Sequence, residues 1–314
     1  MRRLVIVNRA FQLGLSVCCL LLAPVAARAG IDDLFNAVQQ SEFRFFRMQS
    51  EVPFIPLGWV QEKHYLETEY TPTSGNLPSG KATESTFSEG LALPAFIAKR
   101  DMLVLGEDIL WDRIDVKSGP YTDKDVLMVT PLVAWLHQFN SNNLAAAFGA
   151  PILSTTLNQG NSWGAECYAG IIGLHWQSDQ VQWLYGGVYE YSYGRNFGYP
   201  YLGFMWLPTP KISISLTYPW PTISYSPQDR WLFQILAAPG GSSWVVQQNN
   251  VRTSQSFNVW TLTGGVGYRF YEKLWLMAGA GVAGLRGVKI GDSGSQQLEG
   301  KPGAVFTLSV QFRP

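Results

Sequence analysis

Several long segments of the sequence alternate, residue by residue, between large apolar side chains and small or polar ones. The alternation is clear in 181–194, 211–218, 257–270 and the last segment, GAVFTLSVQFRP at 303–314. A period of two predicts β-strands with one apolar face. A soluble sheet would carry long charged side chains on its other face, but here that face is mostly Gly, Ser and Thr. The pattern therefore favours a membrane barrel whose apolar face points outward to lipid.

The composition agrees with this interpretation. Charged residues make up 15% of the chain, against about 25% in average globular domains. Aromatic residues reach 14%, and the formal net charge is zero. Because there is no basic run or basic face, the sequence lacks the electrostatic footprint of a nucleic-acid-binding protein. We therefore expect no nucleic-acid partner.

The N-terminus has the three regions of a secretory signal peptide. Arginines precede a short apolar stretch at 13–23, and small residues flank Arg28 before a cleavage site near Gly30. We assign 1–29 as a signal peptide and expect export to a bacterial outer membrane of Gram-negative type. Residues 30–56 are predicted to contain a short amphipathic helix at 31–48 that lies in the periplasm or plugs the lumen. No later apolar run is long enough for a membrane helix, so only a closed barrel could cross a bilayer.

The breaks between strands predict the topology of residues 57–314. Short breaks lie at 99–101, 139–143, 177–180, 207–211, 226–229 and 270–273, and longer breaks, such as 239–254 and 288–301, alternate with them. This is the arrangement of periplasmic turns and extracellular loops. If the chain reverses at 219–221, the fold class is an all-β, closed antiparallel transmembrane β-barrel of fourteen strands. Twelve strands remain an alternative.

Small and polar residues on the second face of the strands are candidates to line the lumen. In the stretch 102–114, strict alternation would turn one of two adjacent acids towards lipid, so we expect a bulge at Gly106 that directs both inward. The predicted lumen-lining residues are Glu107, Asp108, Glu190, Ser192, Thr261, Thr263 and Arg269.

The sequence offers little for catalysis or cofactor binding. The three histidines are far apart, and none has a partner at metal-ligand spacing. A lipid hydrolase would need Ser and His on one face of the barrel with an orienting group, but His137 and Ser141 flank a predicted turn. We therefore expect no metal, no cofactor, no catalytic residues and no enzyme activity.

The block at 212–246 resembles a bacterial outer-membrane barrel family known only as a domain of unknown function. The resemblance rests on Pro221, Tyr225, Pro227, Trp231, Pro239, Gly240, Gly241 and Trp244. It implies the architecture and the compartment, and it brings no activity or site residues.

The expected function is a porin-like channel for the passive passage of small solutes. The first alternative is a closed structural or surface-binding barrel with adhesin-like loops, and the second is an outer-membrane lipid hydrolase. Expected partners are outer-membrane lipid, the barrel-assembly machinery and small solutes. Homo-oligomerisation is left open by the sequence.

Overall fold

The computed structural model describes residues 50–53, 55–74, 78–158, 163–192, 195–248, 251–290 and 296–313. In these ranges the chain is almost entirely antiparallel β-sheet. The predicted signal peptide at 1–29 and the predicted helix at 31–48 lie outside the described residues. Among the described residues, no helix has the length and apolar character needed to span a membrane.

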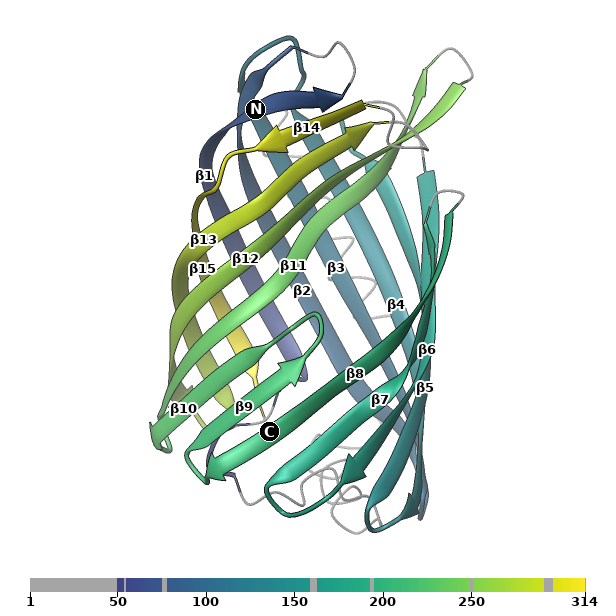
Figure 1. The fold of residues 1–314 in the computed structure, drawn as a ribbon, viewed down its shortest axis with the longest axis vertical. Helices are drawn as coiled ribbons and strands as arrows, with labels where there is room; N and C mark the ends of the chain where they lie inside the picture. Colours follow the sequence, from purple (N-terminus) through teal and green to yellow (C-terminus); the bar gives the residue numbers. More distant parts are fainter. Residues whose placement is uncertain are drawn as a thin grey trace.

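The sheet consists of fifteen segments wound into a tall barrel (Figure 1). They are β1 (Gly58–Ser74), β2 (Gly80–Ile97), β3 (Asp101–Ser118), β4 (Lys124–Asn140), β5 (Asn143–Thr156), β6 (Trp163–Trp176), β7 (Val181–Ser192), β8 (Arg195–Thr209), β9 (Ile212–Thr217), β10 (Thr222–Gln228), β11 (Trp231–Gln248), β12 (Val251–Tyr271), β13 (Leu274–Ile290), β14 (Gln296–Gly300) and β15 (Gly303–Phe312).

The barrel is closed and has fourteen strands, as predicted. Segments β14 and β15 together form one strand of the barrel, because both pair with β13 on one side and with β1 on the other. The other segments pair in chain order, and β12–β13 completes the circle. The chain reverses between β9 and β10 at residues 218–221, where the sequence predicted a hairpin.

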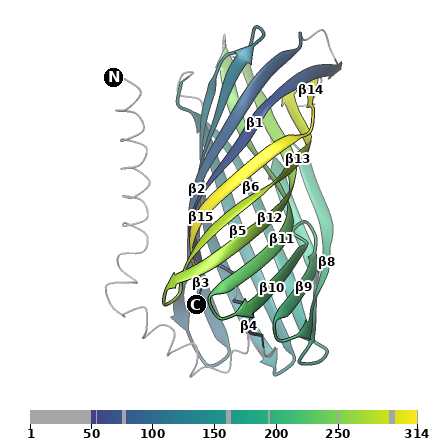
Figure 2. The ribbon, with the colours of Figure 1, turned by 90° about the vertical axis from the view of Figure 1, so that its left-hand side faces the viewer.

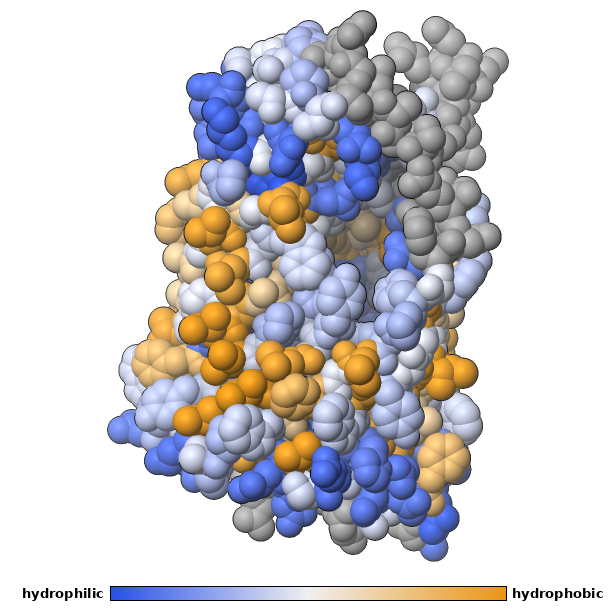
Figure 3. All heavy atoms as spheres, viewed as in Figure 1, coloured by the Kyte–Doolittle hydropathy of each residue, from blue (hydrophilic) through white to orange (hydrophobic). Residues whose placement is uncertain are grey.

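The apolar faces of the strands point outward, also as predicted. On β12, Leu262 is 57% exposed, whereas its neighbour Thr261 on the inner face is 7% exposed. On β15, Leu308 is 52% exposed and the adjacent Ser309 is 4% exposed. Figure 3 shows apolar residues around the middle of the outer surface and hydrophilic residues at both ends. Such a surface fits a barrel that is surrounded by lipid at the middle of its height and by water at both ends.

The two ends of the barrel differ. The end with the tight turns at 98–100, 141–142, 177–180, 210–211, 229–230 and 272–273, drawn lowest in Figure 1, is called the turn end. The opposite end is called the loop end. One expected loop, 239–254, is instead mostly strand: β11 runs to Gln248, β12 resumes at Val251, and the two pair throughout. The polar residues and glycines of this segment predicted a loop. Hydrogen bonds between paired strands join backbone groups, however, so they form whatever the side chains are.

The segment before β1 lies across the turn end. The Glu51 N–H donates to the carbonyl of Pro210, 2.7 Å away, in the turn between β8 and β9. Val52 packs on Leu232 of β11 and on Trp275 and Met277 of β13. The Leu57 N–H then bonds the carbonyl at the end of β15. Residues 50–53 and 55–57 therefore narrow this mouth of the barrel.

Candidate functional site: the lumen and its wall

A polar cavity of about 110 Å³ lies inside the barrel wall formed by β1, β11, β12, β13 and β15. Two predicted residues, Thr261 and Thr263, line it and donate to carbonyls of β11. Its other polar lining residues are Gln61, Lys63, Gln234, Thr307, Ser309 and Gln311. Alternate residues of a strand point to the same face of the sheet. Polar residues two positions apart, such as Gln61 and Lys63, therefore both face the cavity.

The expected bulge at Gly106 is wrong. Pairing of β3 with both neighbours runs without a shift from 104 to 110. Glu107 and Asp108 therefore face opposite sides of the sheet, and Asp108 shares the inner face with Asp112. Glu107 lies on the outer face, where its residue is only 4% exposed. The prediction that both acids line the lumen is thus wrong for Glu107.

The remaining predicted residues are spread over the inner wall and are not brought together. Glu190 lies on the inner face of β7, opposite Tyr168 of β6. Arg269 lies near the turn end, with its guanidinium 5.9 Å from the Trp275 ring and 4.0 Å from Asp229. Ser192 ends β7, and its side chain lies outside the described residues. Their role in lining a conducting lumen stays a prediction.

A buried charged cluster, to which no sequence pattern pointed, lies inside the loop-end half of the barrel. The Arg286 side chain is 0% exposed, and its Nη2 lies 3.8 Å from a carboxylate oxygen of Glu84, which is 3% exposed. The guanidinium carbon lies 5.5 to 5.9 Å from the ring centres of Tyr65, Tyr70 and Phe257. Cation–π contact of this kind stabilises a desolvated cation.

A second buried acid, Asp112 of β3, belongs to the same cluster. It accepts a hydrogen bond from the Ser242 hydroxyl of β11 and a longer one, 3.4 Å, from Thr86. Apolar and aromatic side chains surround the cluster on the inner face of the wall. They are Tyr65, Tyr70, Ala82, Val126, Trp244, Phe257, Val259, Ala283, Leu298 and Val305. The inner wall around the charged cluster is therefore packed.

An irregularity in β13 explains why Arg286 points inward. Trp260 of β12 pairs with Gly284, but Asn258 pairs with Gly287, so β13 holds one extra residue there. Leu285 has a positive φ of 48° and is 77% exposed. Such a bulge shifts the alternation by one residue. Without it, Arg286 would point towards lipid.

A second irregularity bends β11 across the lumen. At Pro239–Gly241, called the kink, Gly241 has a φ of 133°, and a Cβ there would lie 2.0 Å from the Phe257 carbonyl oxygen. Only glycine accepts this backbone. Beyond the kink, adjacent residues bond opposite walls: Ser242 bonds β3, and the Ser243 hydroxyl donates to Glu166 of β6 at 2.8 Å. Residue pairs of β11 also approach β4, β5 and β6.

The same half of the barrel has an opening in its side. The β9–β10 hairpin is short: β8 pairs with β9 only from Gly203 to Thr209, and β11 pairs with β10 only from Trp231 to Leu236. Above the hairpin, no described residue pairs with the facing edges of β8 and β11. The space-filling view is hollowed at this place, towards the upper right of Figure 3.

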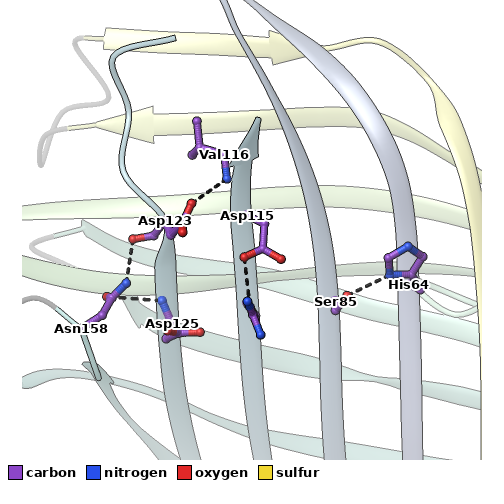
Figure 4. A network of polar contacts seen from close by, with 8 residues as sticks. His64, Ser85, Asp115, Val116, Asp123, Asp125 and Asn158 are labelled. Atoms are coloured by element: carbon purple, nitrogen blue, oxygen red, sulfur yellow. Dashed lines mark hydrogen bonds and ion pairs between the residues drawn. The ribbon is translucent and has the colours of Figure 1, made fainter. Parts of the chain in front are cut away.

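Figure 4 shows a group of polar contacts between side chains and backbone groups of neighbouring strands. Arg113 Nε donates to Asp115 at 3.0 Å, and Asp123 accepts from the Val116 N–H at 3.0 Å. Nearby, His64 Nδ1 and Ser85 Oγ are 2.8 Å apart. Among the described residues, His64 has no carboxylate or amide partner to orient it, as a hydrolase would require. His137 instead bonds Asp101 at 2.9 Å.

An antiparallel barrel with no free end to its sheet, an apolar exterior and a polar interior is the architecture of the transmembrane β-barrels of outer membranes. The chain belongs to the family described as "Domain of unknown function (DUF6268)", whose model matches residues 136–312. The resemblance carried by residues 212–246 is thereby confirmed.

The chain also matches solved structures of other proteins, each with a TM-score below 0.5. A KdgM porin has a TM-score of 0.34 and 8% identity, covering 81% of this chain and 98% of that chain. A FadL homologue from Pseudomonas aeruginosa has a TM-score of 0.45 and 10% identity, covering 81% and 89%. The translocator domain of the autotransporter NalP from Neisseria meningitidis has a TM-score of 0.30 and 11% identity, covering 83% and 89%. No curated protein sequence matches this chain.

Proposed function

We propose that this protein is an outer-membrane channel for the passive passage of small solutes. The observation that carries the proposal is the polar cavity enclosed by a wall that is apolar on its outside. A barrel serving only as a scaffold needs no enclosed polar space, because packed side chains would stabilise it better. The turn end would face the periplasm, where short turns belong.

Planar-bilayer recording of the purified protein tests this function. Steady current levels that scale with salt concentration are expected. Silence from protein whose folded state is shown by its heat-dependent gel mobility would overturn the channel and leave a closed structural barrel. Fatty-acid release from phospholipid vesicles, measured in parallel, would instead identify a lipid hydrolase.

Lys63 should bias the ion selectivity of the channel. It is the charged residue among those lining the cavity, and it interacts electrostatically with Glu84 and Asp108. Replacing Lys63 by methionine removes the positive member and leaves both acids, so cations should pass more readily relative to anions. We expect a severalfold rise in the K⁺ to Cl⁻ permeability ratio, measured from the reversal potential in a KCl gradient.

Lys301 supplies the matched control for this prediction. It is an exposed lysine whose Nζ lies 2.7 Å from Glu69 at the loop end, away from the cavity. Lys301→Met should leave the permeability ratio close to that of the wild type, because exposed charges are screened by salt. Equal effects of the two substitutions would show that the cavity is not the conducting path.

A further inference from the structure

The polar cavity in the wall has a floor without side chains. Gly265 of β12 pairs with Gln234 of β11 on one side and with Gly279 of β13 on the other. Gly279 in turn pairs with Thr307 of β15. A Cβ at Gly279 would lie 2.7 Å from the Thr307 hydroxyl oxygen, and one at Gly265 would lie 3.2 Å from the Ala278 carbonyl oxygen. The hollow therefore exists because two neighbouring strands carry glycine at the same level.

Packed apolar residues bound the cavity towards both ends of the barrel. Met277 lines the cavity and belongs to the group on which Val52 packs at the turn end. Val305 also lines it and belongs to the apolar residues around the charged cluster. The cavity volume of about 110 Å³ corresponds to about four water molecules, at ~30 Å³ each in the liquid. A solute bound there must therefore consist of few non-hydrogen atoms.

Hydrogen-bond donors gather at one side of the cavity. Lys63 and Gln61 of β1 and Thr307 of β15 line it, and Lys63 pairs with Thr307 in the sheet. No described residue forms an ion pair with the half-buried Lys63 ammonium, and none hydrogen-bonds the Gln61 amide or the Thr307 hydroxyl. An ammonium withdrawn from water without an acceptor is unfavourable. This side of the cavity therefore favours a negatively charged ligand.

The surrounding charges limit that ligand to one negative charge. Glu84 and Asp108 interact electrostatically with Lys63 without forming an ion pair with it. Glu84 is already paired with Arg286, so Asp108 is the acid that a second negative charge would meet. Like charges placed next to each other oppose binding. A monoanion therefore suits the cavity better than a dianion.

The opposite side of the cavity offers hydrogen-bond acceptors. The Gln234 Nε2 donates to the Ser224 hydroxyl at 3.1 Å, which leaves the amide oxygen of Gln234 to accept. The Thr263 hydroxyl donates to the Leu236 carbonyl and can still accept through its oxygen. A ligand hydroxyl satisfies these groups, whereas a carboxylate does not.

We propose that the cavity binds small hydroxymonocarboxylates such as lactate, with the carboxylate on Lys63 and the hydroxyl towards Gln234 and Thr263. Gln61 and Thr307 complete the carboxylate site. Hydrogen bonds between an ammonium and a carboxylate are charge-assisted and therefore strong. Passage of such solutes through the barrel rests on the proposed channel function, whereas their binding in the cavity does not.

Isothermal titration calorimetry of the protein in lipid nanodiscs and chloride-free buffer tests the proposal, with sodium lactate as the probe. Lactamide keeps the hydroxyl and removes the charge, and malonate adds a second charge. Lactate should bind about tenfold more tightly than either, because charge-assisted hydrogen bonds are about twice as strong as neutral ones. Equal affinities for lactate and lactamide, or no binding of lactate, would overturn the site.

Two lysine substitutions test where the carboxylate lies. Lys63→Met should weaken lactate binding about tenfold, because it removes the charge-assisted bonds. Lys301→Met changes an exposed lysine at the loop end and should leave lactate binding as in the wild type. Unchanged lactate affinity in Lys63→Met would contradict the assignment of the carboxylate to Lys63.

Two adjacent glycines of β12 test whether the ligand occupies the cavity. Gly265 lines the cavity, whereas Gly264 lies on the outer face, where an added Cβ would meet no atom within 4 Å. Gly265→Val should fill the hollow and abolish lactate binding, and Gly264→Val should preserve it. Equal lactate binding by the two variants would refute the location. The comparison of lactate with lactamide uses the wild type, so a variant that fails to fold does not remove the test.

The failure of this inference can be told from the failure of the channel. Lactate binding by a protein that conducts no current would uphold the site and remove the passage. Steady conductance without lactate binding would remove the ligand class and leave the channel.

Discussion

Replacing Arg286 by methionine should lower the free energy of unfolding by about 3–5 kcal/mol, the usual result of removing one partner from a buried ion pair. Methionine fills a similar volume but leaves Glu84 and Asp112, which are 3% and 1% exposed, without the cation between the packed rings. The measurement is urea unfolding in lipid vesicles, followed by tryptophan fluorescence.

Arg113 provides the matched control. It is paired with Asp115 at the polar edge of the outer face, and its side chain is 38% exposed. Exposed pairs contribute about 0–1 kcal/mol, so Arg113→Met should cost little. Adding Glu84→Gln to Arg286→Met should recover part of the lost stability, because it removes one of the stranded charges. If Arg286→Met and Arg113→Met unfold at the same urea concentration, the buried cluster does not stabilise the barrel.

The second large effect is expected at the kink. Gly241→Ala places a Cβ against the Phe257 carbonyl at a φ of 133°, which alanine rarely adopts. Strain of this kind costs about 1–3 kcal/mol if it is kept. The strand can relieve it by straightening, which would withdraw Ser242 and Trp244 from the lumen. We therefore expect lower stability together with higher single-channel conductance.

The adjacent Gly240 provides the matched control. Replacing it tests the general effect of losing a glycine without the positive φ of Gly241. The φ of Gly240 is not in the positive region, and an added Cβ would lie 3.3 Å from a methyl group of Val259. Gly240→Ala should therefore change conductance little. A conductance of Gly241→Ala that matches that of Gly240→Ala would show that the bend in β11 does not close the loop end.

The architecture could be predicted from the sequence because alternation and turn spacing are local properties. The faces of β12 and β15 and the reversal at 218–221 all follow from short stretches read independently. One expected loop is instead a pair of strands, because two polar segments hydrogen-bond to each other through the backbones of β11 and β12. No single segment contains that information.

Features that depend on irregular pairing were not predictable. The two adjacent acids of β3 suggested a bulge, yet the pairing there is regular and Glu107 lies on the outer face. The bulge that does reverse the alternation lies in β13 next to Leu285, in a run of small residues that gave no reason to expect one. The charged cluster also joins β2, β3 and β13, and alternation within one strand says nothing about such distant contacts.

The seam between the first and last strands has a consequence for how the barrel forms. β1 pairs with β15 at eight successive positions, from Gly58 with Phe312 to Tyr65 with Val305 (Figure 2). The wall therefore cannot close until the ten residues of β15 have been synthesised and have reached the first strand. Contacts so distant along the chain form slowly, and until they form, two unpaired strand edges need protection from other proteins.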